Sequence, residues 1–223
     1  MSNLKLPRCA LQFQAVNFCA LFIVQGANMR RGLMLLVLVA AVAGCSDPKT
    51  ANESNFKVAI QQHLDVVYPR CYLTVKFPFS SRSDWLNTSR QLDALVSVGV
   101  VSATDAGNKE KNYELTELGR KFYKQDAVKG LSGDSHGGFC FGKATVTAVK
   151  QFSEPGDILG HKLSRVNYEY SVSDLPDWAQ GEQVQAQFKE LKADAGSRDK
   201  PLKAMDTVLL TNKGWVHEKQ FRQ

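Results

Sequence analysis

An apolar run over residues 33–42 is the feature that most limits what this chain can fold into. It follows Arg30 and Arg31 and is too short to cross a bilayer as a permanent helix, which needs about 20 apolar residues. It has instead the length of a signal-peptide core. Three small residues and Cys45 close the run. We therefore expect residues 29–44 to be a signal peptide and the folded body to follow it.

The closing sequence Val42-Ala43-Gly44-Cys45 resembles the lipobox of bacterial lipoproteins. In that family the cysteine thiol is diacylglycerylated and the chain is cut just before it, which implies that Cys45 is the lipidated N-terminus. In the enterobacterial type, an Asp directly after this cysteine retains the protein at the inner membrane. Ser46 stands there in this chain. The resemblance therefore implies an anchor in the outer membrane, with the body in the periplasm.

The residues around this signal have simple expected roles. We expect translation to start at Met29, with residues 1–28 an over-extended N-terminus, because a signal peptide should begin at its basic end. The rival is a genuine first hydrophobic segment over residues 18–24, which polar residues interrupt on its N-terminal side. Residues 45–54 are polar and contain Pro48, which suits a short flexible tether.

Net charge argues against nucleic acid as a partner. The chain has 28 basic and 22 acidic residues, and its calculated pI is about 9.0. Four of the basic residues and none of the acidic ones precede Cys45. The remaining 24 basic and 22 acidic residues give a net charge of only +2, an ordinary value for a soluble surface.

Cysteine usage agrees with export. Of the five cysteines, two precede Met29 and one is the expected lipidation site, which leaves Cys71 and Cys140. An even pair in an oxidising compartment favours a disulfide. The alternative is two separate buried thiols. The chain-entropy model gives such a bond about 4 kcal/mol of stabilisation.

Residues 55–127 combine helical and strand patterns. Apolar spacing predicts helices over residues 55–67 and 84–98, with Ser54 and Ser83 as N-caps and with Trp85 and Leu86 on the buried face of the second. Strands are expected at 71–77, 100–101 and 112–116, followed by a helix over 117–124.

The segments Leu92-Asp-Ala-Leu-Val-Ser-Val-Gly-Val-Val101 and Tyr113-Glu-Leu-Thr-Glu-Leu-Gly119 resemble the winged-helix family. The resemblance implies a winged-helix-like module over residues 55–127. DNA binding does not carry over, because the expected reading helix offers only Arg82 and Arg90 where phosphate contacts need a basic cluster. We expect a packing or protein-binding module.

Residues 128–138 are rich in Gly and Ser, which predicts a linker. The remainder, 139–223, is expected to be an antiparallel, strongly curved β module, so the fold class is α+β. Strands are expected at 139–152, 162–172, 184–191, 203–211 and 215–218. Asn212-Lys213-Gly214 predicts a tight hairpin between the last two.

The sequence offers few candidates for chemistry. Asp134-Ser135-His136 contains the residue types of a catalytic triad, but adjacent residues usually point apart, and a polar loop is the better interpretation. None of the four histidines has a second ligand at metal-binding spacing, so we expect no metal site and no cofactor.

Asp174-Leu-Pro-Asp-Trp178 is the most distinctive loop. Trp178 could form a ligand platform beside Asp174 and Asp177. The alternative, which we favour, is that Trp178 closes the end of a sheet.

The sequence therefore predicts a non-catalytic periplasmic lipoprotein that binds or scaffolds at the envelope. Its expected partners are a membrane, through its lipid, and an envelope protein. One alternative is an envelope hydrolase with a cleft near His136 and Trp178. Another, which requires that export fails, is a DNA-associated regulator.

Overall fold

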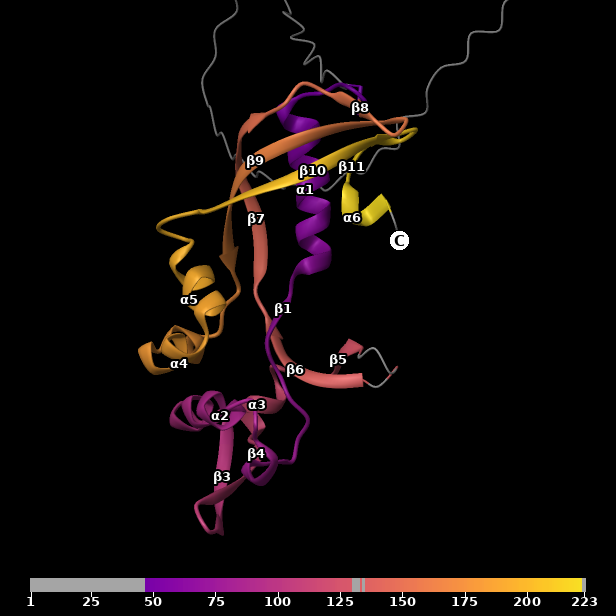
Figure 1. Ribbon diagram of the computed structural model, residues 1–223. Coiled ribbons are helices and arrows are strands. Elements are labelled where there is room, and N and C mark those ends of the chain that lie inside the picture. Colours follow the sequence, from indigo (N-terminus) through magenta and orange to yellow (C-terminus); the bar gives the residue numbers. More distant parts are fainter. Residues whose placement is uncertain (1–46, 130–132, 134, 222–223) are drawn as a thin grey trace, which may run out of the picture. The chain divides into compact units, whose positions relative to one another are not determined.

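The computed structural model describes residues 47–129, 133 and 135–221, all within the compact unit Cys45–Gln223 (Figure 1). The expected signal peptide and Cys45 itself lie outside the described residues. Every strand pair in the described part of the chain is antiparallel. The expected α+β class is confirmed, and so is a curved antiparallel sheet, which curls into half a barrel.

The larger sheet has the strand order β11-β10-β9-β7, with β8 paired to β9. Its strands are β7 (Lys143–Phe152), β8 (Gly156–Ile158), β9 (His161–Ser173), β10 (Leu202–Thr211) and β11 (Gly214–His217). In β7, Ala144 and Val146 are buried between exposed neighbours, the period of two expected when one face is covered. The expected hairpin is present, with Thr211 paired to Gly214.

Helix α1 (Glu53–Val67) packs on this sheet and contacts both of its edge strands, β7 and β11. Phe56 on α1 is fully buried, with its ring centroid 4.8 Å from Phe152 and 4.9 Å from Trp215. The N-cap is Asn52 rather than Ser54, and its side chain accepts a hydrogen bond from Asn55 N. Helix α1 therefore belongs to the core of the larger sheet.

One side chain of α1 covers part of the open edge of β7. Gln61 Nε2 donates to the carbonyl oxygen of Ala144 at 3.0 Å, and Gln61 Oε1 accepts from the Val146 amide at 2.8 Å. The amide group thus replaces, at one position, the neighbouring strand that β7 lacks on this side.

A second core gathers two smaller sheets and several helices. One sheet has the order β1-β6-β5 and the other β2-β4-β3. The strands are β1 (Arg70–Thr74), β2 (Phe79–Ser80), β3 (Val101–Gly107), β4 (Glu110–Leu115), β5 (Tyr123–Lys129) and β6 (Ser135–Phe141). The helices are α2 (Thr88–Ser97), α3 (Glu117–Arg120), α4 (Glu182–Gln187) and α5 (Lys189–Gly196), with 3-10 turns η1 (Ser81–Ser83) and η2 (Asp177–Gln180). The last helix, α6 (Glu218–Phe221), instead contacts β10 and β11 of the larger sheet.

This second core is made by α2, both smaller sheets and the α4–α5 pair. Leu92, Tyr113, Phe139 and Leu191 are among its most deeply buried members. Helix α1 contributes no residue to it. The winged-helix-like module expected over residues 55–127 therefore gains no support from the packing, because its expected first helix lies in the other core.

Four expected elements differ from the observed ones. The helix expected over residues 117–124 ends at Arg120, and β5 begins at Tyr123. The strand expected at 184–191 is wrong: the segment forms α4 and α5, and its buried residues Val184, Phe188 and Leu191 follow the four- and three-residue spacing of a helix. The strand expected at 139–152 is divided by Gly142, whose φ of +90° is accessible mainly to glycine. Parts of the expected linker 128–138 belong to strands β5 and β6.

The start of α2 also differs from expectation. The helix begins at Thr88, and the carboxylate of Asp84 accepts hydrogen bonds from the amides of Thr88 and Ser89 at 2.8 and 2.7 Å. Trp85 and Leu86 therefore lie in the loop before the helix, with 87% and 74% of their surface exposed. Their expected place on a buried face is wrong.

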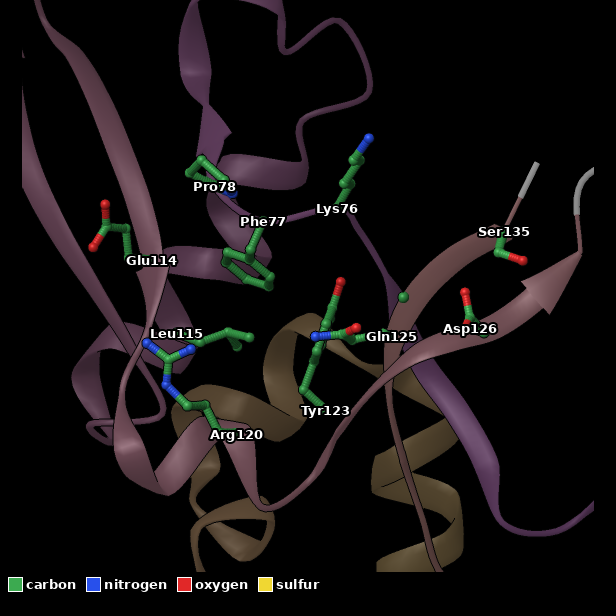
Figure 2. Close-up of a pocket in the computed structure, with 11 residues that line it drawn as sticks. Lys76, Phe77, Pro78, Glu114, Leu115, Arg120, Tyr123, Gln125, Asp126 and Ser135 are labelled. Atoms are coloured by element: carbon green, nitrogen blue, oxygen red, sulfur yellow. The ribbon is translucent and has the colours of Figure 1, made fainter.

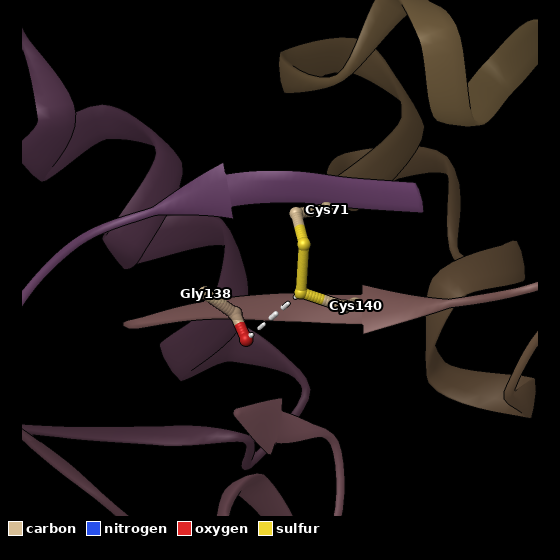
Figure 3. Close-up of a disulfide and its surroundings, with 3 residues drawn as sticks. All are labelled: Cys71, Gly138 and Cys140. Carbon is tan, nitrogen blue, oxygen red and sulfur yellow. Dashed lines mark hydrogen bonds between the residues drawn. A yellow bond between two sulfur atoms is a disulfide. The ribbon is translucent and has the colours of Figure 1, made fainter. Parts of the chain in front are cut away.

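Cys71 on β1 and Cys140 on β6 stand opposite each other in the strand register and form a disulfide with an S–S distance of 2.03 Å (Figure 3). This is the pair that the cysteine pattern indicates. Figure 3 also marks the 3.4 Å separation between Cys140 Sγ and the carbonyl oxygen of Gly138. The disulfide joins residues 69 positions apart and connects β1 to the β5–β6 hairpin.

Candidate functional site

A cavity of about 480 Å³ opens beside the β5–β6 hairpin (Figure 2). Three segments line it: the stretch after β1, the end of β4 with α3, and the hairpin itself. The lining residues are Lys76, Phe77, Pro78, Glu114, Leu115, Arg120, Tyr123, Gln125, Asp126, Ser135 and Gly137. This volume lies within the roughly 300–1,000 Å³ typical of small-molecule sites.

Aromatic packing fixes the floor of the cavity. The rings of Phe77 and Tyr123 meet edge to face with centroids 5.4 Å apart, and both contact Phe139 of the second core. The Tyr123 hydroxyl donates to the carbonyl oxygen of Val75 at 2.7 Å. Burial raises the pKa of Tyr123 above its usual value, so the hydroxyl remains a donor at neutral pH.

Gly137 makes this arrangement possible. A Cβ atom at position 137 would overlap the hydroxyl and ring of Tyr123, which lies across β6 at this point. The reason is space, because Gly137 does not have a positive φ. The glycine-rich composition that predicted a linker therefore reflects in part the close approach of a tyrosine ring to a strand.

Charged side chains of both signs surround the floor. Lys76 and Arg120 are cationic, and Glu114 and Asp126 are anionic. Within the described part of the chain, none of the four forms a salt bridge. In Figure 2, Glu114 and Arg120 lie on one side of Phe77 and Tyr123, and Asp126 and Ser135 lie on the other. The cavity can therefore offer opposite charges to one bound molecule.

Sequence reasoning missed these residues. Apart from the polar-loop residue Ser135, no cavity residue was a candidate for function, because they come from three distant segments that form no motif. The expectation of a linker over residues 128–138 also hid the hairpin. The segment from Tyr123 to Lys129 has three polar residues in a row and then two apolar ones, so no regular alternation in the sequence indicated this strand.

The loop singled out from the sequence lies elsewhere. Asp174, Asp177 and Trp178 help to line a wide depression of about 530 Å³. The Trp178 ring packs edge to face on Phe122 and Phe141, with centroid distances of 5.6 and 5.2 Å. This packing favours the interpretation in which Trp178 closes the second core.

The residues of the hydrolase alternative are not brought into one cavity. His136 is exposed on β6, between the two cavity residues Ser135 and Gly137, and does not itself line the cavity. Trp178 lines the depression, whose lining does not include His136. Asp134 lies outside the described residues. No observation favours the hydrolase.

Two other histidines form a buried contact. The rings of His63 on α1 and His217 on β11 stack with centroids 3.6 Å apart. His217 Nδ1 accepts a hydrogen bond from the Lys219 amide, and His217 Nε2 lies 3.4 Å from Asp206 Oδ1. Burial, followed by the charge of His217, lowers the pKa of His63. Both ring nitrogens of His217 therefore face protein groups. The stacked pair His63 and His217 connects α1 to the larger sheet.

A buried carboxylate joins the two cores. Asp194 Oδ2 on α5 accepts hydrogen bonds from the hydroxyls of Tyr68 at 3.0 Å and Tyr72 at 2.6 Å, and Arg70 Nη1 lies 3.7 Å away. Burial raises the pKa of both tyrosines, and the adjacent carboxylate raises it further. Asp194 Oδ1 has no partner among the described residues. No cavity described above includes Asp194 in its lining.

Comparison with known proteins adds no relative. No family model matches the chain, and no curated protein or solved structure matches it. Within the described residues there is no group of three or more His, Cys, Asp or Glu side chains placed to hold a metal ion. The described helices are also all too short or too polar to cross a membrane.

Proposed function

We propose that this chain is an exported bacterial lipoprotein whose body acts as a non-catalytic binding module in the periplasm. The cavity over Phe77 and Tyr123 carries the binding part of the proposal. A fixed aromatic floor is surrounded by charged side chains that form no ion pair with any described residue, an arrangement suited to bind a small polar molecule.

The anchor part rests on the ordered signal that ends at Cys45. The outer membrane is the proposed location because Ser46 follows the cysteine. The described chain packs on the body from its first residues: the indole of Trp215 donates to the Lys49 carbonyl at 3.0 Å, and Asn55 Nδ2 donates to the Asp47 carbonyl at 2.9 Å. A lipid on Cys45 would thus hold the body close to the membrane, with much less free tether than residues 45–54 would allow.

The anchor is tested with Cys45→Ala in a bacterial host supplied with radiolabelled fatty acid. The wild-type protein should incorporate label and sediment with the outer membrane. Cys45→Ala should lose both properties, while the control variant Thr50→Ala, downstream of the lipobox, should keep them. Equal labelling of Cys45→Ala and wild type would overturn the lipid anchor.

Binding is tested by protein NMR on residues 46–223 mixed with the small-molecule fraction of a bacterial envelope extract. The largest chemical-shift changes should fall on Phe77, Tyr123 and Gly137. Ser135→Trp, which places a bulky ring in the lining, should abolish them, whereas Thr145→Trp at an exposed position of β7 should not. Shifts that are absent, or that occur only outside the cavity, would overturn the binding function.

A protein partner is part of the proposal because of the loop before α2. Asp84 fixes this loop on the N-terminus of α2, so Trp85 and Leu86 are held exposed. Exposed tryptophans on a fixed loop are common centres of protein interfaces. A photo-crosslinker at position 85 should capture a discrete envelope protein in cells, and one at exposed Leu159 should not.

We also propose a narrower winged-helix likeness, limited to α2 and the β2-β4-β3 sheet. A helix followed by an antiparallel hairpin, with a short third strand beside it, supports this reading. The proposed role is packing and partner contact, with no nucleic acid as a ligand, because the net charge after Gly44 is low.

A further inference from the structure

The cavity over Phe77 and Tyr123 carries an inference about the class of ligand. We propose that it binds a short zwitterionic peptide, of dipeptide size, with the peptide carboxylate on Arg120 and the peptide ammonium on Asp126. This inference rests on the proposed binding function and narrows it to one class of small molecule.

The charges of the lining exclude simpler ligand classes. A site for an anion would gather cations, and a site for a cation would gather carboxylates. Here two cations and two carboxylates line one cavity, and none of the four is paired within the described part of the chain. A single ligand that carries both charges can pair with groups of both signs at once.

The placement of the charges sets the length of the ligand. Arg120 ends α3 on one side of the aromatic floor, whereas Asp126 and Ser135 come from the β5–β6 hairpin on the other side (Figure 2). Phe77 and Tyr123 lie between them. In a free amino acid the two charges are adjacent, with no uncharged part between them to lie over the rings. A dipeptide separates its charges by a peptide unit that can lie over the rings.

The chemistry of the side chains sets the direction of the peptide. The planar guanidinium of Arg120 can donate two parallel hydrogen bonds to a carboxylate. Asp126 can accept from an ammonium group, and the Ser135 hydroxyl provides a second acceptor nearby. The floor does not need to rearrange, because the Tyr123–Val75 hydrogen bond already fixes it.

The test uses residues 46–223 and three probes in calorimetric titrations at low salt: L-alanyl-L-alanine, its N-acetyl form without the ammonium, and its C-terminal amide without the carboxylate. The dipeptide should bind, and each blocked form should bind about tenfold more weakly, the loss expected for one hydrogen bond to a charged group. Added salt should weaken binding of the dipeptide.

Variants assign each charge to its partner. Arg120→Gln should weaken binding of the dipeptide about tenfold and leave binding of the amide unchanged. Asp126→Asn should likewise weaken binding of the dipeptide about tenfold, and it should leave binding of the acetylated form unchanged. Arg165→Gln and Asp157→Asn, which change exposed charges on β9 and β8 outside the cavity lining, are the matched controls. Equal binding of all three probes, or equal effects of Arg120→Gln on dipeptide and amide, would overturn the zwitterion inference.

The results of these titrations and of the NMR experiment together distinguish a failure of the dipeptide inference from a failure of the proposed binding function. If the dipeptide does not bind but the envelope extract still shifts Phe77, Tyr123 and Gly137, the cavity is a binding site and the ligand class is wrong. If neither binds, the proposed function fails as well. Binding of the dipeptide that Ser135→Trp does not reduce would place the peptide elsewhere and also overturn the inference.

Discussion

Gln61 provides a direct test of how α1 is held on the larger sheet. Its side chain donates to the Ala144 carbonyl and accepts from the Val146 amide, and both of these residues are 1% exposed. Gln61→Ala would leave both backbone groups without a partner. A buried backbone group without a hydrogen-bond partner costs about 1–3 kcal/mol. Gln61 is only half-buried, so water can reach part of the space that the shorter alanine side chain leaves.

We therefore expect Gln61→Ala to lower the free energy of unfolding by about 2 kcal/mol, after a small gain from the helix propensity of alanine. For a body of this size, Tm should fall by about 4–8 °C. Urea unfolding measures the first quantity, and hydrogen exchange at the Val146 amide reports on the site itself. Gln62→Ala, one position along on an exposed site, should change stability by less than about 0.5 kcal/mol. Equal stability of the two variants, or unchanged exchange at Val146, would refute the edge-covering role.

Three further outcomes are expected. Replacing Cys71 and Cys140 together by serine should lower stability by about 4 kcal/mol, and reduction of the wild-type protein should lower it equally in urea unfolding. Because the pKa of His63 is lowered, the folded protein binds a proton at this imidazole less readily than the unfolded chain does. The contribution of His63 to stability should therefore be full above pH 6.5 and fall below it, and His63→Gln should flatten that part of the pH profile. Residues 46–223 should show no sub-micromolar binding to random duplex DNA at about 0.15 M salt, and tight binding that weakens steeply with salt would restore the DNA-associated regulator.

Local patterns predicted the parts of the fold that depend on neighbours in the sequence. Alternation predicted β9 and β10, and the Asn-Lys-Gly turn predicted the hairpin that follows β10. The strand expected at 184–191 failed for a specific reason. Val184, Phe188 and Leu191 fit a helical spacing, and the alternation required a one-residue slip to accommodate the last of them.

Tertiary packing decided what local patterns could not. Helix α1 has an apolar face that would suit either core, and nothing in its sequence indicates that it joins β7 and β11. Trp85 and Leu86 are apolar, so the sequence placed them inside; the Asp84 cap starts α2 three residues after Trp85 and leaves both outside. The cavity residues come from three segments that only the fold brings together.

The disulfide and the candidate site share the same structural unit. Cys71 lies on β1 and Cys140 on β6, and it is β6 that carries Gly137, over which the Tyr123 ring lies. The Tyr123 hydroxyl in turn bonds to Val75, just past the end of β1. The disulfide and this hydrogen bond therefore fix β1 and the residue just after it to the β5–β6 hairpin at two points. Because a preformed floor spares a ligand the cost of ordering it, the disulfide would also favour the proposed binding.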